Sequence, residues 1–176
     1  MRIYLIGYKC CGKSTIGPIL AEKLGFELID LDSLIEERHG KSIPELFITN
    51  DEINFRKMER DAFFEIMKTE NIVVATGGGF PCWFNNMELL KRSGIVVFLK
   101  VDPRNLYYRM KRIAQERPVL KGRTGLALKW HINKMLRKYG HIYYNAHIVH
   151  ENNTLNADTL VHKIKLYKNA LIHNLQ

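Results

Sequence analysis

Short runs of apolar, largely β-branched residues recur along the chain and predict β-strands. Three of these runs, Ile3–Ile6, Ile72–Ala75 and Ile95–Leu99, are continuously apolar rather than alternating. Such runs are typical of parallel strands that are buried on both faces of a sheet. A fourth run, Phe26–Asp30, ends in an acidic turn, and Ala146–Val149 is a weaker fifth. The pattern therefore predicts five strands.

Segments with apolar residues at helical spacing lie between these runs. Their limits are marked by residues that favour helix ends, such as Ser42 as a cap, Pro103 at a first helical position and Gly25 as a stop. The predicted helices are Ser14–Leu24, Leu31–His39, Ile43–Thr49, Asp51–Lys68, Asn86–Arg92, Pro103–Ile113, Leu126–Lys138 and Leu155–Ala170. Strands that alternate with helices predict an α/β fold, a three-layer α/β/α sandwich around a parallel sheet. The sequence contains no linker or repeat, so we expect residues 1–176 to form a single domain.

The charge of the chain is concentrated in one segment. The chain has 176 residues, with 27 Lys and Arg against 18 Asp and Glu, a formal net charge of +9. Such an excess suggests nucleic acid or an acidic ligand as the partner. However, residues 100–144 hold 12 basic and 2 acidic side chains, whereas residues 1–99 hold 12 and 14. This distribution argues against a uniform nucleic-acid surface and favours a segment that binds a small anion.

Cysteine content and hydropathy indicate the compartment. Cys10, Cys11 and Cys82 give neither an even count nor a CxxC zinc spacing. No apolar run approaches the ~20 residues of a membrane span, and the N-terminal run is too short for a signal peptide. We therefore expect a reduced cytoplasmic protein that does not bind membranes.

The strongest chemical signal is the segment Gly7–Thr15, which fits the phosphate-binding pattern G-x-x-x-x-G-K-[ST]. A predicted strand precedes it and a predicted helix follows, as the pattern requires. The glycines let backbone N–H groups turn toward a phosphate, and the helix N-terminus adds partial positive charge. We expect Lys13 to reach the β- and γ-phosphates of ATP and Ser14 to ligate Mg²⁺.

Three residues within this loop are unusual. Lys9 adds a cation, which could help to bind phosphate or face solvent, and the solvent-facing interpretation is the favoured one. Cys10 and Cys11 stand where small residues are common, and thiols near a helix N-terminus and a lysine can have a lowered pKa. Redox regulation of these thiols is one interpretation, and replacement of one small residue by another is the favoured one.

Two carboxylates, Asp30 and Asp32, follow the second predicted strand. Ligands of open α/β sheets bind at that edge. One carboxylate can belong to the Mg²⁺ shell, and the other can accept a hydrogen bond from a substrate hydroxyl and help to remove its proton. A helix N-cap would explain only one of the two.

Two further motifs suggest contacts with a substrate. Arg56 and Glu59 are spaced i, i+3, so they can pair on one helix face and present the guanidinium fork to a carboxylate. The third predicted strand is followed by Gly77, Gly78 and Gly79, and three successive glycines permit close approach of a ligand to the backbone.

An arginine in the basic segment is a candidate for phosphate contact. Arg117 precedes Pro118 in a loop that also holds Gly122 and Gly125. Such a loop is typical of a mobile lid that brings an arginine to the transferred phosphate.

The order and spacing of these motifs resemble the shikimate kinase family. The resemblance runs from about residue 2 to 150 and rests on IGxxxxGKST, FELIDLDSLIEERHGKSIPELF, the ExxFRxxE pattern at Glu52–Glu59, TGGG and the Arg-Pro pair. It implies a P-loop kinase fold like that of adenylate kinase, with strand order 2-3-1-4-5. It also implies a mobile lid at about 112–126 and a substrate-binding helical region at about 32–62.

The resemblance also implies a reaction. ATP would phosphorylate the 3-hydroxyl of shikimate, in the pathway to chorismate and the aromatic amino acids, with Mg²⁺ as cofactor. The implied catalytic residues are Lys13, Asp32 and Arg117. The implied ATP-binding residues are Cys10, Cys11, Gly12, Lys13, Ser14, Thr15, Arg109 and Arg117, with Arg109 near the adenine. The implied Mg²⁺ residues are Ser14 and Asp30, and the implied shikimate-binding residues are Asp32, Arg56, Glu59, Gly77, Gly78, Gly79 and Tyr139. We expect a monomer that binds no nucleic acid.

The chain departs from the family pattern at two positions. Cys10 stands where the family usually has Gly, and Tyr139 stands where it usually has an Arg that clamps the substrate carboxylate. Arg137 or Lys138 would need a register shift to replace that Arg. The alternatives are a related kinase for another hydroxy acid or polyol, a nucleotide-binding protein with little catalysis, and a nucleic-acid binder.

Overall fold

Five parallel strands form one sheet in the order β2-β3-β1-β4-β5, which confirms the predicted order. The strands are β1 (Arg2–Ile6), β2 (Glu27–Asp30), β3 (Ile72–Ala75), β4 (Ile95–Lys100) and β5 (Ile148–Glu151). This computed structural model describes residues 1–116 and 125–173, and only the backbone of residues 113–116. Every strand runs parallel to its neighbours, so all carboxyl ends meet at one edge of the sheet.

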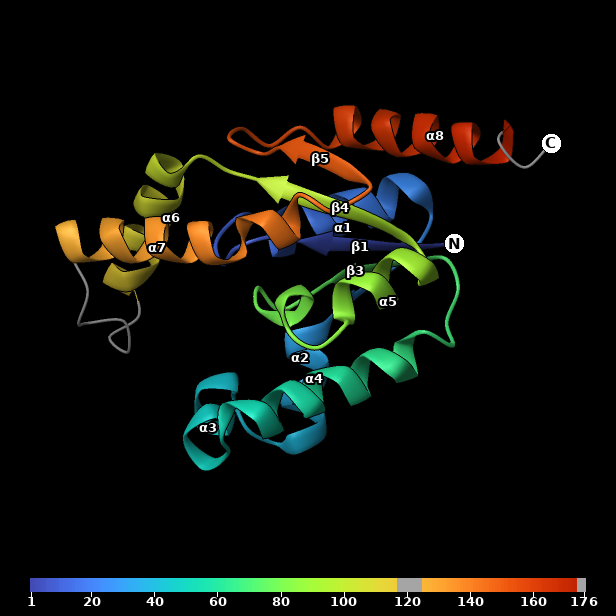
Figure 1. Ribbon diagram of the computed structural model, residues 1–176. Coiled ribbons are helices and arrows are strands. Elements are labelled where there is room, and N and C mark those ends of the chain that lie inside the picture. The colour runs from blue at the N-terminus through green and yellow to red at the C-terminus, as the bar shows by residue number, and fades with distance from the viewer. Residues whose placement is uncertain (117–124, 174–176) are drawn as a thin grey trace.

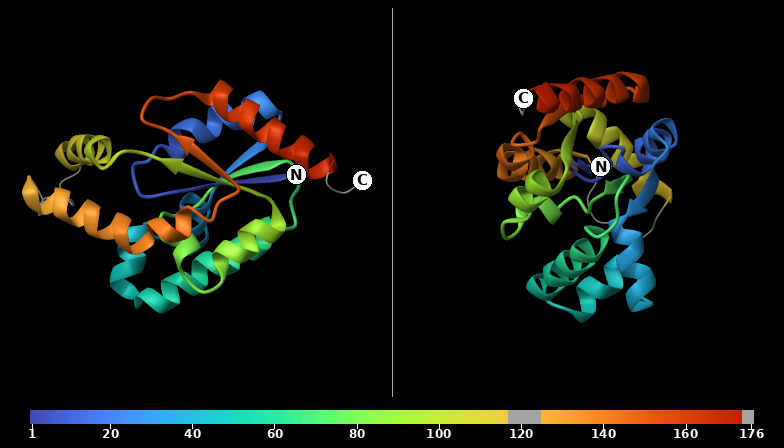
Figure 2. Two further views of the ribbon diagram at one scale, coloured as in Figure 1. Left: turned by 45° about the horizontal axis from the view of Figure 1, so that its top comes forward. Right: turned by 90° about the vertical axis from the view of Figure 1, so that its right-hand side faces the viewer.

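Helices cover both faces of the sheet and give the predicted three layers (Figure 1). They are α1 (Lys13–Leu24), α2 (Leu31–His39), α3 (Ile43–Thr49), α4 (Glu52–Ile66), the 3₁₀ turn η1 (Phe80–Cys82), α5 (Asn86–Ser93), α6 (Pro103–Glu116), α7 (Leu126–Tyr143) and α8 (Ala157–His173). Figure 2 shows α1 and α8 on one face and α4 and α5 on the other. The pair α6 and α7 reaches beyond the carboxyl ends of the strands, as Figure 1 shows.

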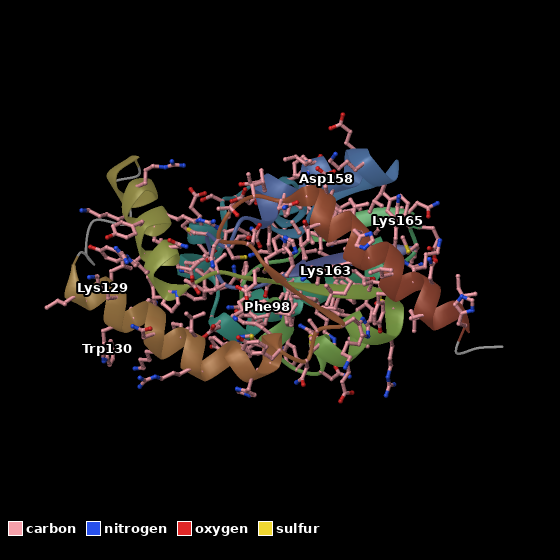
Figure 3. The ribbon with its side chains drawn as sticks, turned by 90° about the horizontal axis from the view of Figure 1, so that it is seen from above. Phe98, Lys129, Trp130, Asp158, Lys163 and Lys165 are labelled. Atoms are coloured by element: carbon pink, nitrogen blue, oxygen red, sulfur yellow. The ribbon has the colours of Figure 1, made fainter. Side chains whose placement is uncertain are left out.

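Polar contacts fix α8 on its face of the sheet (Figure 3). The ammonium of Lys163 donates to the carbonyl of Val149 in β5 at 3.2 Å. Asp158, in the first turn of α8, pairs with Lys23 of α1 at 2.8 Å. The helix is therefore held both to the sheet and to its neighbouring helix.

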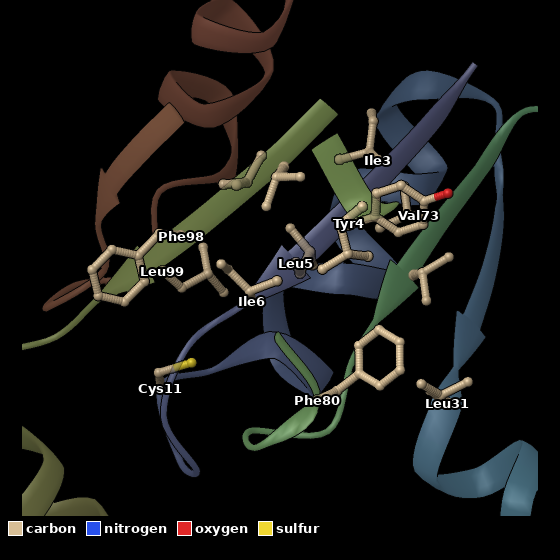
Figure 4. Packing of buried hydrophobic residues seen from close by; sticks show 14 of the residues in the cluster. Ile3, Tyr4, Leu5, Ile6, Cys11, Leu31, Val73, Phe80, Phe98 and Leu99 are labelled. Carbon is tan, nitrogen blue, oxygen red and sulfur yellow. The ribbon is translucent and has the colours of Figure 1, made fainter. Parts of the chain in front are cut away.

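The hydrophobic core lies around β1, the central strand (Figure 4). The side chains of β1 from Ile3 to Ile6 have no exposed area. Tyr4 packs against Phe63 of α4 with ring centroids 5.6 Å apart, and Phe63 packs against Phe80 at 5.2 Å. This aromatic cluster joins α4 and the η1 turn to the centre of the sheet.

Several predicted elements begin or end one to five residues away from their predicted limits. The fifth strand begins at Ile148 rather than Ala146, a shift of two residues that keeps the same side chains on the buried face. Helix α7 continues past Lys138 and through Gly140 to Tyr143. It continues because Tyr143 is buried and its ring stacks on Phe98 at 5.3 Å.

The predicted lid region at about 112–126 overlaps two helices. Helix α6 runs to Glu116 and α7 begins at Leu126, so the ends of that region are helical rather than loop. Arg117 and Pro118 lie outside the described residues. Within residues 1–116 and 125–173, no helix is both long enough and apolar enough to cross a membrane.

Two neighbouring phenylalanines of α4 test the aromatic cluster. Phe63 has no exposed area, whereas Phe64 is 43% exposed. Because Phe63→Ala leaves a cavity beside Tyr4 and Phe80, it should lower the free energy of unfolding by about 3–5 kcal/mol. The matched variant Phe64→Ala should lower the free energy of unfolding by less than half of that amount. Urea unfolding followed by circular dichroism measures both, and equal losses would show that the cluster is not the centre of the core.

Candidate active site

The phosphate-binding loop connects β1 to α1 through backbone conformations that favour glycine. Gly7 and Gly12 have φ angles of 139° and 104°. The ammonium of Lys13 lies over the loop and donates to the carbonyls of Gly7 at 2.9 Å and Tyr8 at 3.4 Å. The lysine is therefore held at the mouth of the loop, at the N-terminus of α1, where a phosphate is stabilised by the helix dipole.

Cys10 occupies a strained position in this loop. Its φ of 62° lies in the left-handed region, which costs a non-glycine residue on the order of 1 kcal/mol or more. This conformation explains why glycine suits the position better. Burial raises the pKa of the Cys10 thiol, although Lys9 and Lys13 oppose the effect. The thiol is therefore not activated by its lysine neighbours, which favours simple replacement of a small residue over a redox role.

A cavity of about 670 Å³ opens above the loop at the N-terminus of α1. Its lining residues are Cys10, Gly12, Lys13, Ser14, Thr15, Tyr108, Arg109, Arg112, Asn152 and Leu155. Six of these belong to the predicted ATP-binding set. Cys11 does not line the cavity, because its side chain is buried beneath the loop. Sequence reasoning missed four of the lining residues, which come from α6 and from the segment after β5 and carry no motif.

Arg109 fixes the wall of this cavity through backbone carbonyls. Its guanidinium donates to the carbonyls of Asn152 at 2.7 Å and Asn153 at 2.9 Å, and to those of Cys11 at 3.2 Å and Cys10 at 3.4 Å. Asn152 donates to the same Cys11 carbonyl at 2.8 Å. Arg109 therefore joins the phosphate-binding loop to the segment after β5, while it also faces the cavity.

Asp30, at the end of β2, both caps helix α2 and contacts Ser14. One carboxylate oxygen caps α2 and accepts from the backbone N–H groups of Asp32 at 3.0 Å and Ser33 at 3.4 Å. The other accepts from the hydroxyl of Ser14 at 3.2 Å. The cap interpretation thus applies to Asp30, and the same side chain meets the predicted Mg²⁺ ligand Ser14. Asp32 is left free of the capping role.

A second cavity, of about 310 Å³, lies on the other side of the phosphate-binding loop. Its lining residues are Tyr8, Lys9, Asp32, Ile43, Phe47, Glu52, Phe55, Arg56, Glu59, Gly77, Gly78, Gly79, His131, Met135 and Tyr139. All seven predicted substrate-binding residues are in this set. We call it the acceptor cavity. Burial raises the pKa of Asp32, and the nearby Asp30 carboxylate adds to the effect.

Arg56 is held rigidly at the wall of the acceptor cavity. Its guanidinium donates to Glu59 at 2.6 Å and to Glu52 at 3.2 Å. The rings of Phe47, Phe55 and Trp83 lie 5.3–5.5 Å from its central carbon. The planar cation is therefore positioned before any substrate arrives, and a carboxylate can meet a preorganised fork.

The three glycines after β3 make room for these charged groups. A Cβ on Gly77 would lie 2.6 Å from Glu59 Oε1 and 2.9 Å from Asp32 Oδ1, and one on Gly79 would lie 2.8 Å from Arg56 Nη2. A Cβ on Gly78 would lie 3.2 Å from the backbone nitrogen of Lys9. At each glycine, the volume that a Cβ would fill is thus occupied by a different part of the candidate site.

Helix α7 presents one row of residues to the acceptor cavity. Tyr143 donates from its hydroxyl to the carbonyl of Gly78 at 2.7 Å, which fixes the rotation of the helix. Tyr139 lies one turn earlier, and Met135 and His131 continue the row into the cavity. Arg137 and Lys138 are exposed and lie outside the lining. Tyr139 therefore faces the acceptor cavity, whereas the two cations that precede it in α7 do not.

Lys9 differs from its sequence-based expectation. It is exposed, as predicted, but it also lines the acceptor cavity rather than facing solvent alone. The strained turn at Cys10 directs the preceding residues toward the glycines after β3, an arrangement that no local pattern indicates.

The shikimate kinase family model matches residues 9–167. The chain belongs to the shikimate kinase family. It is 39% identical to the shikimate kinase of Parabacteroides distasonis over 171 residues, 97% of each chain. It is 41% identical to that of Bacteroides thetaiotaomicron over 160 residues, 91% of this chain and 89% of the relative.

Solved structures of the family share this fold. A crystal structure of the shikimate kinase from Bacteroides thetaiotaomicron is 37% identical, with a TM-score of 0.84 over 98% of each chain. The shikimate kinase from Acinetobacter baumannii in complex with shikimate is 33% identical, with a TM-score of 0.81 over 99% of this chain and 95% of that one.

Glu59 is expected to make the stability of this family member depend on pH. Burial raises its pKa from an ordinary 4.5 to about 7, although Arg56 opposes the shift. The folded state binds the proton of the Glu59 carboxyl more tightly than the unfolded state does. The contribution of this proton to the free energy of unfolding is therefore complete below the unfolded pKa and is lost as the pH rises toward 7. The stability of Glu59→Gln relative to the unmodified chain should therefore rise between about pH 5 and 7. Urea unfolding at several pH values measures this difference, and a constant difference contradicts it.

Gly77 and Gly140 test the space beside the carboxylates. A Cβ at Gly77 meets Glu59 and Asp32, whereas nothing lies within 4 Å of a Cβ at Gly140. Gly77→Ala should lower the free energy of unfolding by about 1–3 kcal/mol. Gly140→Ala, inside a helix, should raise it by about 0.5–1 kcal/mol. Thermal and urea unfolding compare the two, and a Gly77→Ala variant as stable as the unmodified chain contradicts the prediction.

Proposed function

We propose that the chain transfers the γ-phosphate of ATP to the 3-hydroxyl of shikimate, as its family name indicates, and releases ADP and 3-phosphoshikimate. One observation carries the proposal: the phosphate-binding loop lies between two cavities. Cys10 and Gly12–Thr15 face the larger cavity, whereas Tyr8 and Lys9 face the acceptor cavity. A phosphate bound by the loop therefore lies next to both an ATP-sized space and a space for a small acid.

The larger cavity fits ATP. Its volume of about 670 Å³ is in the range of cofactor sites. Lys13 and the N-terminal N–H groups of α1 would bind the β- and γ-phosphates. The segment held by Arg109, with Asn152 and Leu155, would form the wall beside the adenosine. Arg117, which lies outside the described residues, is proposed to close over the phosphates.

The residues at this site also fit Mg²⁺. Ser14 and Asp30 bring a hydroxyl and a carboxylate within 3.2 Å of each other beside the phosphate position. Mg²⁺ prefers oxygen ligands and commonly takes only one or two from the protein, with water and phosphate oxygens completing the shell. When bound, the ion would neutralise charge on the phosphates. Ser14 would be its direct ligand, and Asp30 would accept a hydrogen bond in the outer shell.

Asp32 is placed to act on the acceptor hydroxyl. Its carboxylate lines the acceptor cavity beside Gly77, and burial raises its pKa. A carboxylate with a raised pKa is a stronger base. Asp32 would accept the proton of the 3-hydroxyl while the hydroxyl oxygen forms its bond to the γ-phosphorus, and the bond from that phosphorus to ADP breaks. Lys13 would stabilise charge on the transferred group.

Arg56 would bind the carboxylate of shikimate. Glu59 and three aromatic rings hold its guanidinium in the cavity wall. The relative from Acinetobacter baumannii, whose structure contains shikimate, supports this choice of acceptor. We also propose that the chain acts as a monomer in the cytoplasm, within the pathway to chorismate and the aromatic amino acids.

Tyr139 favours a second candidate within the same class. The family pattern has an arginine at this position, and the described part of α7 brings no lysine or arginine side chain into the acceptor cavity. A kinase for another hydroxy acid or polyol would fit this change. Quinate and related acids tested beside shikimate distinguish the two, because the true acceptor gives the highest kcat/KM.

Two variants test the proposed roles by ADP release in the presence of shikimate. Asp32→Asn should lower kcat by about 10²–10⁴-fold, because the proton acceptor is lost. Arg56→Ala should raise the KM for shikimate by about 10–100-fold, which is the loss of a charge-assisted bidentate contact.

Arg60→Ala is the matched control for Arg56→Ala. Arg60 lies one turn further along α4 and also stacks on aromatic rings, those of Phe64 and Phe84, outside the acceptor cavity. The KM of the Arg60→Ala variant for shikimate should equal that of the unmodified chain. Tight ATP binding without turnover of any hydroxy acid would overturn every kinase assignment.

A further inference from the structure

The acceptor cavity has an unfavourable charge balance for an acid. Its lining contains three carboxylates, from Asp32, Glu52 and Glu59, and the two permanent cations Lys9 and Arg56. His131 also lines it. The guanidinium of Arg56 is already shared between Glu52 and Glu59. The guanidinium that an anionic substrate meets is therefore already paired with carboxylates, and a second cation would favour binding of the acid.

Helix α7 does not supply that cation at Tyr139. The hydrogen bond from Tyr143 to Gly78 fixes the helix so that Tyr139 faces the cavity, and its phenol carries no positive charge. Arg137 and Lys138 are exposed outside the lining. The ammonium of Lys138 lies 4.9 Å from the Tyr139 ring centroid, and Lys138 does not line the cavity.

Among the described residues that line the cavity, Lys9 is the remaining permanent cation. Within residues 1–116 and 125–173, its ammonium makes no hydrogen bond and no ion pair. Its backbone nitrogen packs against Gly78, so the residue is anchored where the phosphate-binding loop meets the glycines. The flexible four-carbon stem of a lysine lets such an ammonium reach a ligand group from a fixed backbone position.

We propose that Lys9 is the second cationic contact for the acceptor's carboxylate and thereby a specificity-determining residue. The inference rests on the proposed function. The acid group of shikimate binds between the Arg56 fork and the Lys9 ammonium, so that the positive charge absent from Tyr139 is supplied from the phosphate-binding loop. A neutral analogue gains nothing from Lys9. The residue therefore selects for an acid.

Lys9→Met tests the inference, because it keeps most of the length of the unbranched side chain and removes its charge. The KM for shikimate should rise about tenfold or more, the effect of losing one charge-assisted hydrogen bond. The kcat and the KM for ATP should stay within about twofold, since the phosphate contacts belong to other residues. With the methyl ester of shikimate as the acceptor, Lys9→Met and the unmodified chain should have the same KM.

Two further variants separate a local contact from a general effect of charge. Lys165→Met removes one positive charge from the exposed face of α8, where Figure 3 labels this residue, and should leave the KM for shikimate unchanged. The double variant Lys9→Met with Tyr139→Arg returns a cation to the cavity from α7. It should recover most of the lost affinity for shikimate.

Each other outcome has a definite meaning. A lower kcat or a higher KM for ATP in Lys9→Met, with the KM for shikimate unchanged, would overturn the inference and assign Lys9 to the phosphates. An equal rise in KM for shikimate and its methyl ester would overturn it as well, since the carboxylate would not be the group recognised. An unmodified chain without shikimate-dependent ADP release would overturn the proposed function together with the inference. If the unmodified chain releases ADP in the presence of shikimate and Lys9→Met has the same KM for shikimate, the inference alone is overturned.

Discussion

The parallel pairing of β1 with β3 is the constraint on which the candidate site depends. It aligns Leu5 with Ala75, and the next residue, Thr76, donates to the carbonyl of Leu5 from both its backbone nitrogen and its hydroxyl, at 3.2 and 3.1 Å. The phosphate-binding loop and the three glycines therefore leave the sheet side by side. Every other group of the acceptor cavity is placed against that junction, whether it comes from α2, α3, α4 or α7.

The sequence predicted what depends on local patterns. Strand runs, helix limits and the phosphate-binding motif are determined by neighbours in the chain, and the pairing of Arg56 with Glu59 follows from helical spacing alone. The contacts of Arg109 could not be predicted, because its carbonyl partners lie 43–99 residues away. The position of Lys9 depends on the left-handed conformation of Cys10. A cysteine in the sequence does not predict such a conformation.

The basic segment has a more varied role than its charge suggested. Arg109 and Arg112 line the ATP-sized cavity, as expected for cations that cover a nucleotide. Lysines of α7 instead lie over aromatic rings: Lys129 over Tyr107 at 5.0 Å and Lys134 over Trp130 at 4.8 Å. Figure 3 shows Lys129 and Trp130 on the outer part of α7. Much of the excess positive charge of this segment therefore lies on the surface of a helix. Contacts between an ammonium and an aromatic ring contribute about 0.5–1 kcal/mol each at such exposed sites.

The row on α7 also determines which kinds of sequence change this helix can accept. His131, Met135, Tyr139 and Tyr143 are each four residues apart, and the last is tied to Gly78. Deleting one residue between Tyr139 and Tyr143 would rotate the preceding row by about 100° and bring exposed side chains such as Lys138 toward the cavity. Point substitutions in the row change the chemistry of the acceptor wall, whereas changes in length replace that wall entirely. Substrate preference in this chain can therefore drift by exchange of side chains, but not by gain or loss of residues in α7.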